Sequence, residues 1–93
     1  MWAVKFKRSV KKDLAGLDPP HLRRIKEFLM DTVSVDPKAV GKPPRGHAYP
    51  FWIYRVGDYR IICYLFDAEK EVLVLRVGHR GKVYKQFPGK PDR

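Results

Sequence analysis

Cysteine is almost absent from this 93-residue sequence, which holds only Cys63. A single cysteine cannot form an internal disulfide, the bond that is typical of small secreted proteins. Cys63 lies in an apolar run at residues 59–66, which indicates a small buried hydrophobe, because a catalytic thiol needs an electropositive and partly exposed setting. The sequence also starts without an apolar leader, so we expect a cytoplasmic protein.

Long apolar segments and metal-ligand motifs are also missing. The longest purely apolar stretch, residues 61–66, is far shorter than the roughly 20 residues that a membrane-spanning helix needs. His21, His47 and His79 stand far apart in the sequence, and no phosphate-binding loop or dinucleotide-binding fingerprint occurs. We therefore expect no metal, no cofactor and no membrane partner.

Acidic residues are scarce: 10 Asp and Glu stand against 20 Lys and Arg, for a formal net charge of +10. A surplus of this size in a small domain is typical of proteins that bind polyanions. Nucleic acid, an anionic membrane surface and an acidic protein partner all satisfy the charge. The chain is rich in apolar residues, at 44% hydrophobic and 13% aromatic, which excludes intrinsic disorder and predicts one domain over residues 1–93.

The first half of the chain predicts a strand followed by two helices. Residues 1–7 alternate between apolar and basic side chains, as a half-buried strand does. Ser9 is a typical helix N-cap, and Asp18 followed by Pro19 is a second helix start. Apolar residues then recur at helical spacing through both segments.

The second half predicts an antiparallel meander, which makes the whole an α+β domain of order β-α-α-β-β-β. Proline and glycine concentrate in a loop at residues 36–50. Three strands are expected over residues 50–56, 59–66 and 71–79, then a short strand or extended segment over residues 83–87. We expect the helix pair to cover one face of the sheet.

Strand alternation sorts the meander residues into two faces. The first set is almost wholly apolar and is expected to face the helices: Phe51, Ile53, Ile61, Cys63, Leu65, Leu73, Leu75 and Val77. The second set mixes aromatic and cationic residues: Trp52, Tyr54, Arg60, Ile62, Tyr64, Val74 and Arg76, joined by Arg80 if the register continues past Gly78. Like charges repel one another on a sheet face, so gathered arginines indicate binding rather than stability.

The second face favours single-stranded nucleic acid as the ligand. Bases stack on aromatic rings for about 1–3 kcal/mol each, and arginine forks bind phosphates. A groove for a partner protein and a plain solvated face are the alternatives.

Two segments of the chain resemble the RelE/ParE superfamily of toxins from toxin–antitoxin pairs. They are the Tyr-Arg strand at residues 52–62 and the Gly-His-Arg and Val-Tyr ending at residues 77–80 and 83–84. The run Gly-Lys-Pro-Pro-Arg-Gly at residues 41–46, the opening strand and the helix pair are similar in kind and order. The resemblance covers nearly the whole chain and implies the RelE-like microbial ribonuclease fold.

In its RelE branch, the resemblance implies an mRNA interferase that enters the ribosomal A site and cuts the messenger during translation. In this metal-independent reaction a ribose 2′-OH attacks the adjacent phosphate and leaves a cyclic phosphate and a 5′-OH. The reaction needs a base, cations on the phosphorane and an acid. By position, Arg60 and Arg80 match arginines that stabilise phosphate charge, with Arg80 also a candidate proton donor, and Tyr84 matches a tyrosine that orients the base or the 2′-OH.

The general base is unassigned, because the best-known RelE pattern has two strand lysines where this chain has Trp52 and Tyr54. These two rings are expected either to stack bases, with Tyr54 also a candidate for acid–base chemistry, or to form a covered apolar patch. His79 is of the side-chain type suited to proton transfer near neutral pH. Strand parity nevertheless places His79 on the helix side with Val77, unless the strand ends at Gly78.

Six residues are expected to contact RNA: Trp52, Arg55, Arg76, Lys82, Lys42 and Arg45. The resemblance implies as partners the ribosome, mRNA and a cognate acidic antitoxin, with a heterotetramer as one form of the complex. Two other functions stay open: a ParE-like inhibitor of DNA gyrase, and a decayed module that binds RNA or protein without cutting.

Overall fold

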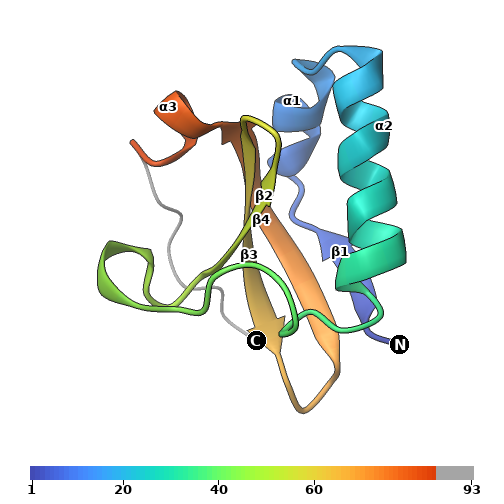
Figure 1. Ribbon diagram of the computed structural model, residues 1–93, viewed down its shortest axis with the longest axis vertical. Coiled ribbons are helices and arrows are strands. Elements are labelled where there is room, and N and C mark those ends of the chain that lie inside the picture. Colours follow the sequence, from blue (N-terminus) through green and yellow to red (C-terminus); the bar gives the residue numbers. More distant parts are fainter. Residues whose placement is uncertain (86–93) are drawn as a thin grey trace.

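A four-stranded sheet forms the centre of the part of the chain that this computed structural model describes, residues 1–85 without the side chain of His47 (Figure 1). Its strands are β1 (Ala3–Phe6), β2 (Trp52–Val56), β3 (Tyr59–Phe66) and β4 (Glu71–His79), in the order β1-β4-β3-β2. The last three form the predicted antiparallel meander, and β1 pairs with β4 in parallel.

Two helices cover one face of the sheet, which confirms the predicted α+β arrangement (Figure 1). They are α1 (Val10–Ala15) and α2 (Pro19–Phe28), and α2 continues into a π-helical turn, η1 (Leu29–Val33). Helix α2 begins with proline, whose fixed φ suits a first helical position. The loop that leads to β2 contains one short 3-10 helix, η2 (Gly46–Ala48).

The chain turns into a short helix after β4, where an extended segment was expected. This helix, α3 (Arg80–Val83), lies on the opposite side of the sheet from α1 and α2 (Figure 1). Glycine at position 78 leaves room for it, because a Cβ there would lie 3.3 Å from the Cβ of Val83. The prediction of a strand from residue 83 was therefore wrong at its start, and residues 86 and 87 lie outside the described residues.

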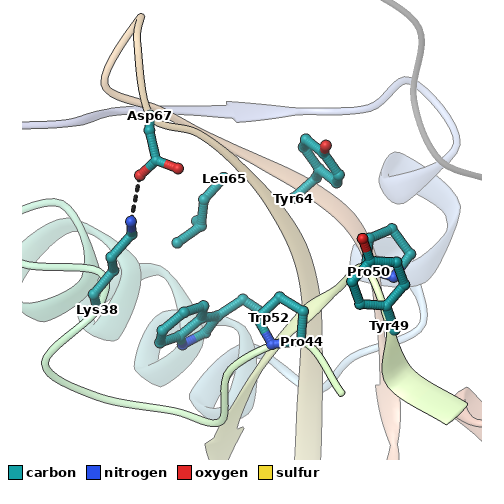
Figure 2. Close-up of a pocket in the computed structure, with 8 residues that line it drawn as sticks. All are labelled: Lys38, Pro44, Tyr49, Pro50, Trp52, Tyr64, Leu65 and Asp67. Carbon is teal, nitrogen blue, oxygen red and sulfur yellow. Dashed lines mark ion pairs between the residues drawn. The ribbon is translucent and has the colours of Figure 1, made fainter. Parts of the chain in front are cut away.

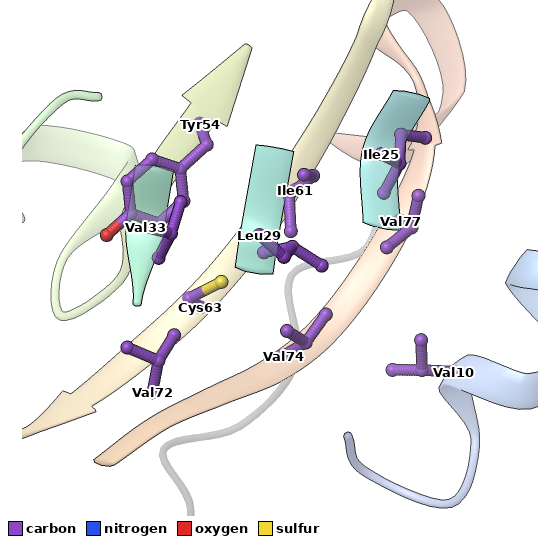
Figure 3. Close-up of a cluster of buried hydrophobic side chains, with 10 residues drawn as sticks. All are labelled: Val10, Ile25, Leu29, Val33, Tyr54, Ile61, Cys63, Val72, Val74 and Val77. Atoms are coloured by element: carbon purple, nitrogen blue, oxygen red, sulfur yellow. The ribbon is translucent and has the colours of Figure 1, made fainter. Parts of the chain in front are cut away.

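The main core lies between the helix pair and the sheet (Figure 3). Its buried members are Val10, Ile25, Leu29, Val33, Tyr54, Ile61, Cys63, Val72, Val74 and Val77. Cys63 is fully buried, as predicted, and this burial raises the pKa of its thiol. The thiol is therefore protonated and shielded, as a structural hydrophobe should be.

A second apolar cluster covers the other face of the sheet. It consists of Phe51, Ile53, Ile62, Leu75 and Val83, with Ala48, Tyr64 and Leu73 packed against it. Val83 comes from α3 and Ala48 from η2, so both faces of the central strands are covered by other parts of the chain.

The face assignment was correct for β3 and wrong for β2. Ile61 and Cys63 face the helices as predicted. Trp52 pairs with Cys63 and Tyr54 pairs with Ile61, and paired residues share a face, so both aromatic residues lie on the helix side. Phe51 and Ile53, which were expected on the helix side, belong to the second cluster.

A β-bulge accounts for the errors in β4. Ile62 pairs with Arg76, whereas its neighbour Cys63 pairs with Val74, so Leu75 is the extra residue. The alternation reverses at this point. Val74 therefore faces the helices, and Leu73 and Leu75 face away, contrary to prediction.

Candidate functional site: a cationic corner of the sheet

Four arginines gather around the tight β2–β3 turn at Gly57 and Asp58. We call them the arginine corner: Arg24, Arg55, Arg60 and Arg80. Arg55 and Arg60 are directly opposite one another on β2 and β3. The backbone N–H of Arg80 donates to the Asp58 carbonyl at 2.8 Å, which ties the start of α3 to the turn.

Arg24 reaches the same turn from α2, on the helix side of the sheet. Its two terminal guanidinium nitrogens would lie 3.7 and 3.8 Å from a Cβ placed on Gly57. In the sequence Arg24 is one of several cations on the polar side of a helix, and no local signal separates it from its neighbour Arg23. Only the packing of α2 against the turn brings it to the corner.

Arg60 is the most enclosed cation of the arginine corner, with 7% of its surface exposed. Its Nη1 donates to the carbonyls of Gly57 and Tyr59, both at 3.0 Å. These two bonds fix the guanidinium against the turn. Because Arg55 lies directly across the pair of strands, the local arrangement keeps two like charges together at a cost to stability, which an anionic ligand would offset.

Arg80 and Tyr84 lie on the same side of α3. Arg80 is the first residue of this helix and is exposed, whereas Tyr84 follows the last residue and is 40% exposed. A spacing of four residues places two side chains one helical turn apart on the same face. The exposed Lys82 belongs to the same short helix.

His79 lies on the helix side of the sheet, on the opposite face from Arg60. Strand β4 continues through His79, which pairs with Tyr59. The two rings meet edge to face at 5.9 Å, and the His79 Nδ1 accepts the backbone N–H of Gly81 at 3.3 Å. His79 is thus the N-cap of α3, and the position that strand parity predicted for it, on the helix side with Val77, is confirmed.

Trp52 and Tyr54 anchor the loop that precedes β2. The Trp52 indole Nε1 donates to the Val40 carbonyl at 2.8 Å, and the Tyr54 hydroxyl donates to the Pro37 carbonyl at 2.7 Å. Tyr54 is fully buried, and burial, followed by the proximity of Cys63 and Asp36, raises the pKa of its phenol. The expectation that Tyr54 stacks bases or transfers protons was therefore wrong, because its ring is shielded and its hydroxyl is neutral and bonded.

Replacing Tyr54 with phenylalanine should lower the free energy of unfolding by about 0.5–1.5 kcal/mol. Tyr54→Phe keeps the ring in the core but leaves the Pro37 carbonyl without this donor. Urea denaturation followed by circular dichroism measures the change. A variant as stable as the native chain would show that the bond to Pro37 contributes nothing.

Arg76 forms a partly buried ion pair with Asp13. Its Nε lies 3.3 Å from Oδ2 of Asp13 on α1, and the same oxygen accepts the Val77 backbone N–H at 3.0 Å. Strand β1 pairs with β4 only as far as Val74, so the carboxylate bonds to β4 beyond the point where β1 ends. Arg76 thus has a structural role, and its side chain stays 32% exposed, so its contact with RNA remains a prediction.

Lys42 and Arg45 are exposed in the loop before β2. The backbone of Lys42 pairs with Ile53 of β2, through hydrogen bonds of 2.8 and 3.1 Å. Both cations are accessible for phosphate contacts, but they lie in a different part of the chain from the arginine corner.

Neither a metal site nor a membrane span is found within residues 1–85. No three His, Cys, Asp or Glu side chains in this range gather as metal ligands. None of its helices is long and apolar enough to cross a membrane.

Together, the helix pair, the meander and the cationic corner define a small α+β protein of the RelE-like class. Residues 4–84 match the family described as the ParE toxin of the type II toxin–antitoxin system, parDE. The chain is 33% identical over 85 residues to Toxin RelG of Mycobacterium tuberculosis, covering 91% of this chain and 98% of that toxin. It belongs to the RelE/ParE family of toxins from type II toxin–antitoxin systems.

Solved structures support the same assignment. The crystal structure of the toxin–antitoxin complex RelBE2 from M. tuberculosis contains a chain that is 34% identical, with a TM-score of 0.79, covering 85% of this chain and 98% of that one. The archaeal RelE–RelB complex from Pyrococcus horikoshii contains one that is 29% identical, with a TM-score of 0.70 and coverages of 87% and 97%. The isolated E. coli RelE toxin is 20% identical, with a TM-score of 0.68 and coverages of 91% and 93%, and shares the fold.

Proposed function

We propose that this toxin is a ribosome-dependent mRNA endonuclease and that the arginine corner is its active site. The observation that carries the proposal is the convergence of Arg60, Arg80 and the Tyr84-bearing helix at one turn of the sheet. All three positions are filled as the RelE-like resemblance requires. Attack of a 2′-OH on the adjacent phosphate builds negative charge on the phosphorane, and fixed cations stabilise that charge.

The arginine corner combines one fixed cation, Arg60, with one accessible cation, Arg80. Arg60 is held by the turn carbonyls, so its positive charge is in place before substrate binds. Arg80 is exposed at the start of α3 and would contact the phosphate oxygens directly. Preorganised charge of this kind is effective because no reorganisation is needed during the reaction.

Strand β2 does not supply the general base. Two β2 side chains share the face of Arg60 near the arginine corner. Ile53 is buried and apolar, and Arg55 is cationic. Tyr84 is the candidate for proton transfer at the 2′-OH, since it lies one helical turn from Arg80 and is partly exposed.

A cognate acidic antitoxin is the second proposed partner, besides the ribosome with its messenger. The matched chains from M. tuberculosis and P. horikoshii are parts of toxin–antitoxin complexes. An acidic segment that folds on binding would neutralise the surplus charge of this chain, formally +10, and cover the arginine corner. Translating ribosomes as target imply action in the cytoplasm.

Primer extension on a defined messenger in a purified translation system tests the function. We expect cuts within A-site codons in the presence of ribosomes and none without them. A gyrase supercoiling assay runs in parallel. Absence of cuts from folded protein, together with inhibition of supercoiling, would assign the chain to the gyrase-inhibiting alternative, and absence of both effects would leave a binding module.

Removing the cap at His79 should slow cleavage through a change in the position of Arg80. Loss of an N-cap costs about 0.5–2 kcal/mol of helix stability, so His79→Ala is expected to reduce the cleavage rate by about 2- to 30-fold. Asparagine is a good N-cap, and His79→Asn should retain most of the activity. Equal inactivity of both variants would instead mean that the imidazole itself transfers protons.

A further inference from the structure

A pocket of about 260 Å³ opens at the opposite end of β2 and β3 from the arginine corner (Figure 2). Its lining combines aromatic rings, prolines, a leucine and a charged pair: Lys38, Pro44, Tyr49, Pro50, Trp52, Tyr64, Leu65 and Asp67. Figure 2 shows these side chains around one common space, with Lys38 and Asp67 together on one side and Tyr49 and Pro50 on the other.

We propose that this pocket binds a nucleobase of single-stranded RNA. The toxin would then hold its messenger at two points, through phosphate at the arginine corner and through a base here. The inference rests on the proposed function, because it assigns a second contact to the same substrate.

The lining suits a flat ligand with polar edges. The Trp52 ring is fixed by its bond to Val40, so it is ordered before a ligand arrives. Tyr49 is 69% exposed, so its ring is accessible for stacking with a base. In the ion pair between Lys38 and Asp67, the ammonium can donate to the edge of a base and the carboxylate can accept from it. An aliphatic protein side chain could use neither group.

The size of the pocket suits a small ligand such as one ring system. Sites for drug-sized molecules span about 300–1,000 Å³. At about 260 Å³ the pocket is slightly smaller than these and has room for a nucleobase.

Charge around the pocket suits a polyanion such as RNA. The exposed Lys42 and Arg45 flank Pro44 in the chain, and Pro44 lines the pocket. These cations can bind the phosphates on either side of a base whose ring is inserted between aromatic side chains.

The spacing to the arginine corner fits a continuous strand of RNA. Tyr64 lies on the same face of β3 as Arg60, four residues away, which is roughly 14 Å along a strand. Trp52 and Leu65 line the pocket from the helix side, so the pocket extends around the sheet edge formed by β2. A few nucleotides span this distance, so the base in the pocket would belong to the messenger close to the cleaved phosphate.

Binding of a short fluorescent oligoribonucleotide with 2′-O-methyl sugars tests the pocket, because this probe cannot be cleaved and needs no ribosome. Tyr49→Ala should weaken binding by about 5- to 150-fold, the loss expected for one stacked base. Tyr49→Phe keeps the ring and should bind as the native chain does. Val35→Ala, at another exposed apolar side chain, is the matched control and should also bind normally.

Two readouts separate base stacking from electrostatic attraction. The salt dependence of binding should be the same for Tyr49→Ala and the native chain, since no charge is removed. A series of probes carries one abasic residue at successive positions of the oligonucleotide. The native protein should lose affinity when the abasic residue stands at one particular position, and the affinity of Tyr49→Ala should not change there.

The proposal is overturned if Tyr49→Ala binds the probe as tightly as the native chain, or if the native chain does not bind it. A variant that loses affinity only for the cognate antitoxin would assign the pocket to the protein partner instead. Because the probe is not cut, these outcomes are independent of whether the toxin cleaves messenger on the ribosome.

Discussion

Replacing Arg80 with alanine is expected to lower the rate of messenger cleavage on the ribosome by about 100- to 1,000-fold, the usual cost of removing one preorganised group that stabilises transition-state charge. Arg80 is exposed at the first position of α3, and its backbone is tied to the β2–β3 turn through Asp58. The side chain therefore leaves without disturbing the core. Single-turnover cleavage of a ribosome-bound messenger, followed by primer extension, measures the loss.

Arg23→Ala is the matched control, because it removes the same charge from an exposed site on α2. It should leave the rate at saturating ribosomes unchanged and lower only the electrostatic part of binding. Equal slowing by Arg23→Ala and Arg80→Ala would show that cleavage depends on the net charge of the protein and not on the position of Arg80 in the arginine corner.

Replacing Gly41 with alanine should destabilise the protein by roughly 2–4 kcal/mol, through left-handed strain and overpacking together. Gly41 has φ +78, and a Cβ there would lie 2.7 Å from the Ile53 carbonyl oxygen and 2.7 Å from Cδ1 of Tyr54. Both neighbours are fixed, one by the sheet and the other by burial. Such a loss is a large share of the total stability of a small domain.

Gly46→Ala separates the two causes of this effect. Gly46 also has a positive φ, +56, but a Cβ there would meet nothing within 4 Å. Only the conformational strain applies, so the expected loss is about 1 kcal/mol. Urea unfolding measures the free energy of unfolding of both variants. Equal losses of stability would show that the contact of the Gly41 Cβ with β2 contributes nothing.

Local chain chemistry was enough to predict the element order and the main helices. The Asp18-Pro19 start of α2 and the turn at Gly57 are marked by residue types with strong conformational preferences, and both occur where expected. The alternation of β3 was also predicted correctly, because its two faces differ in character around Arg60.

The faces of β2 and β4 depend on tertiary contacts that the sequence does not record locally. In β2, Phe51 and Trp52 are both apolar enough for either side, and α3 with η2 covers the side that was expected to be open. In β4, the bulge at Leu75 reverses the alternation without any proline or glycine to mark it. The ambiguity of β2, and not the bulge in β4, is why Tyr54 was assigned to the face that carries Arg60 and is instead in the core.

In the candidate site, too, some residues were predicted from local sequence and others depend on tertiary contacts. Arg60 and Arg80 were predicted from their positions in two short motifs, and the structure brings both to one turn. Arg24 was missed, since its approach to Gly57 depends on how α2 packs. The capping role of His79 required α3, a helix that the sequence did not predict.

In the proposed function, the arginine corner promotes attack by a ribose 2′-OH on the adjacent messenger phosphate. Ribosomes programmed with an all-ribose messenger, and with one carrying a single 2′-deoxy residue at the cleavage position of the A-site codon, test it most directly. We predict rapid cleavage of the first and none of the second at that position, with a 5′-hydroxyl on the downstream product. Equal cleavage of both messengers, or cleavage of neither, would show that the arginine corner does not promote this attack.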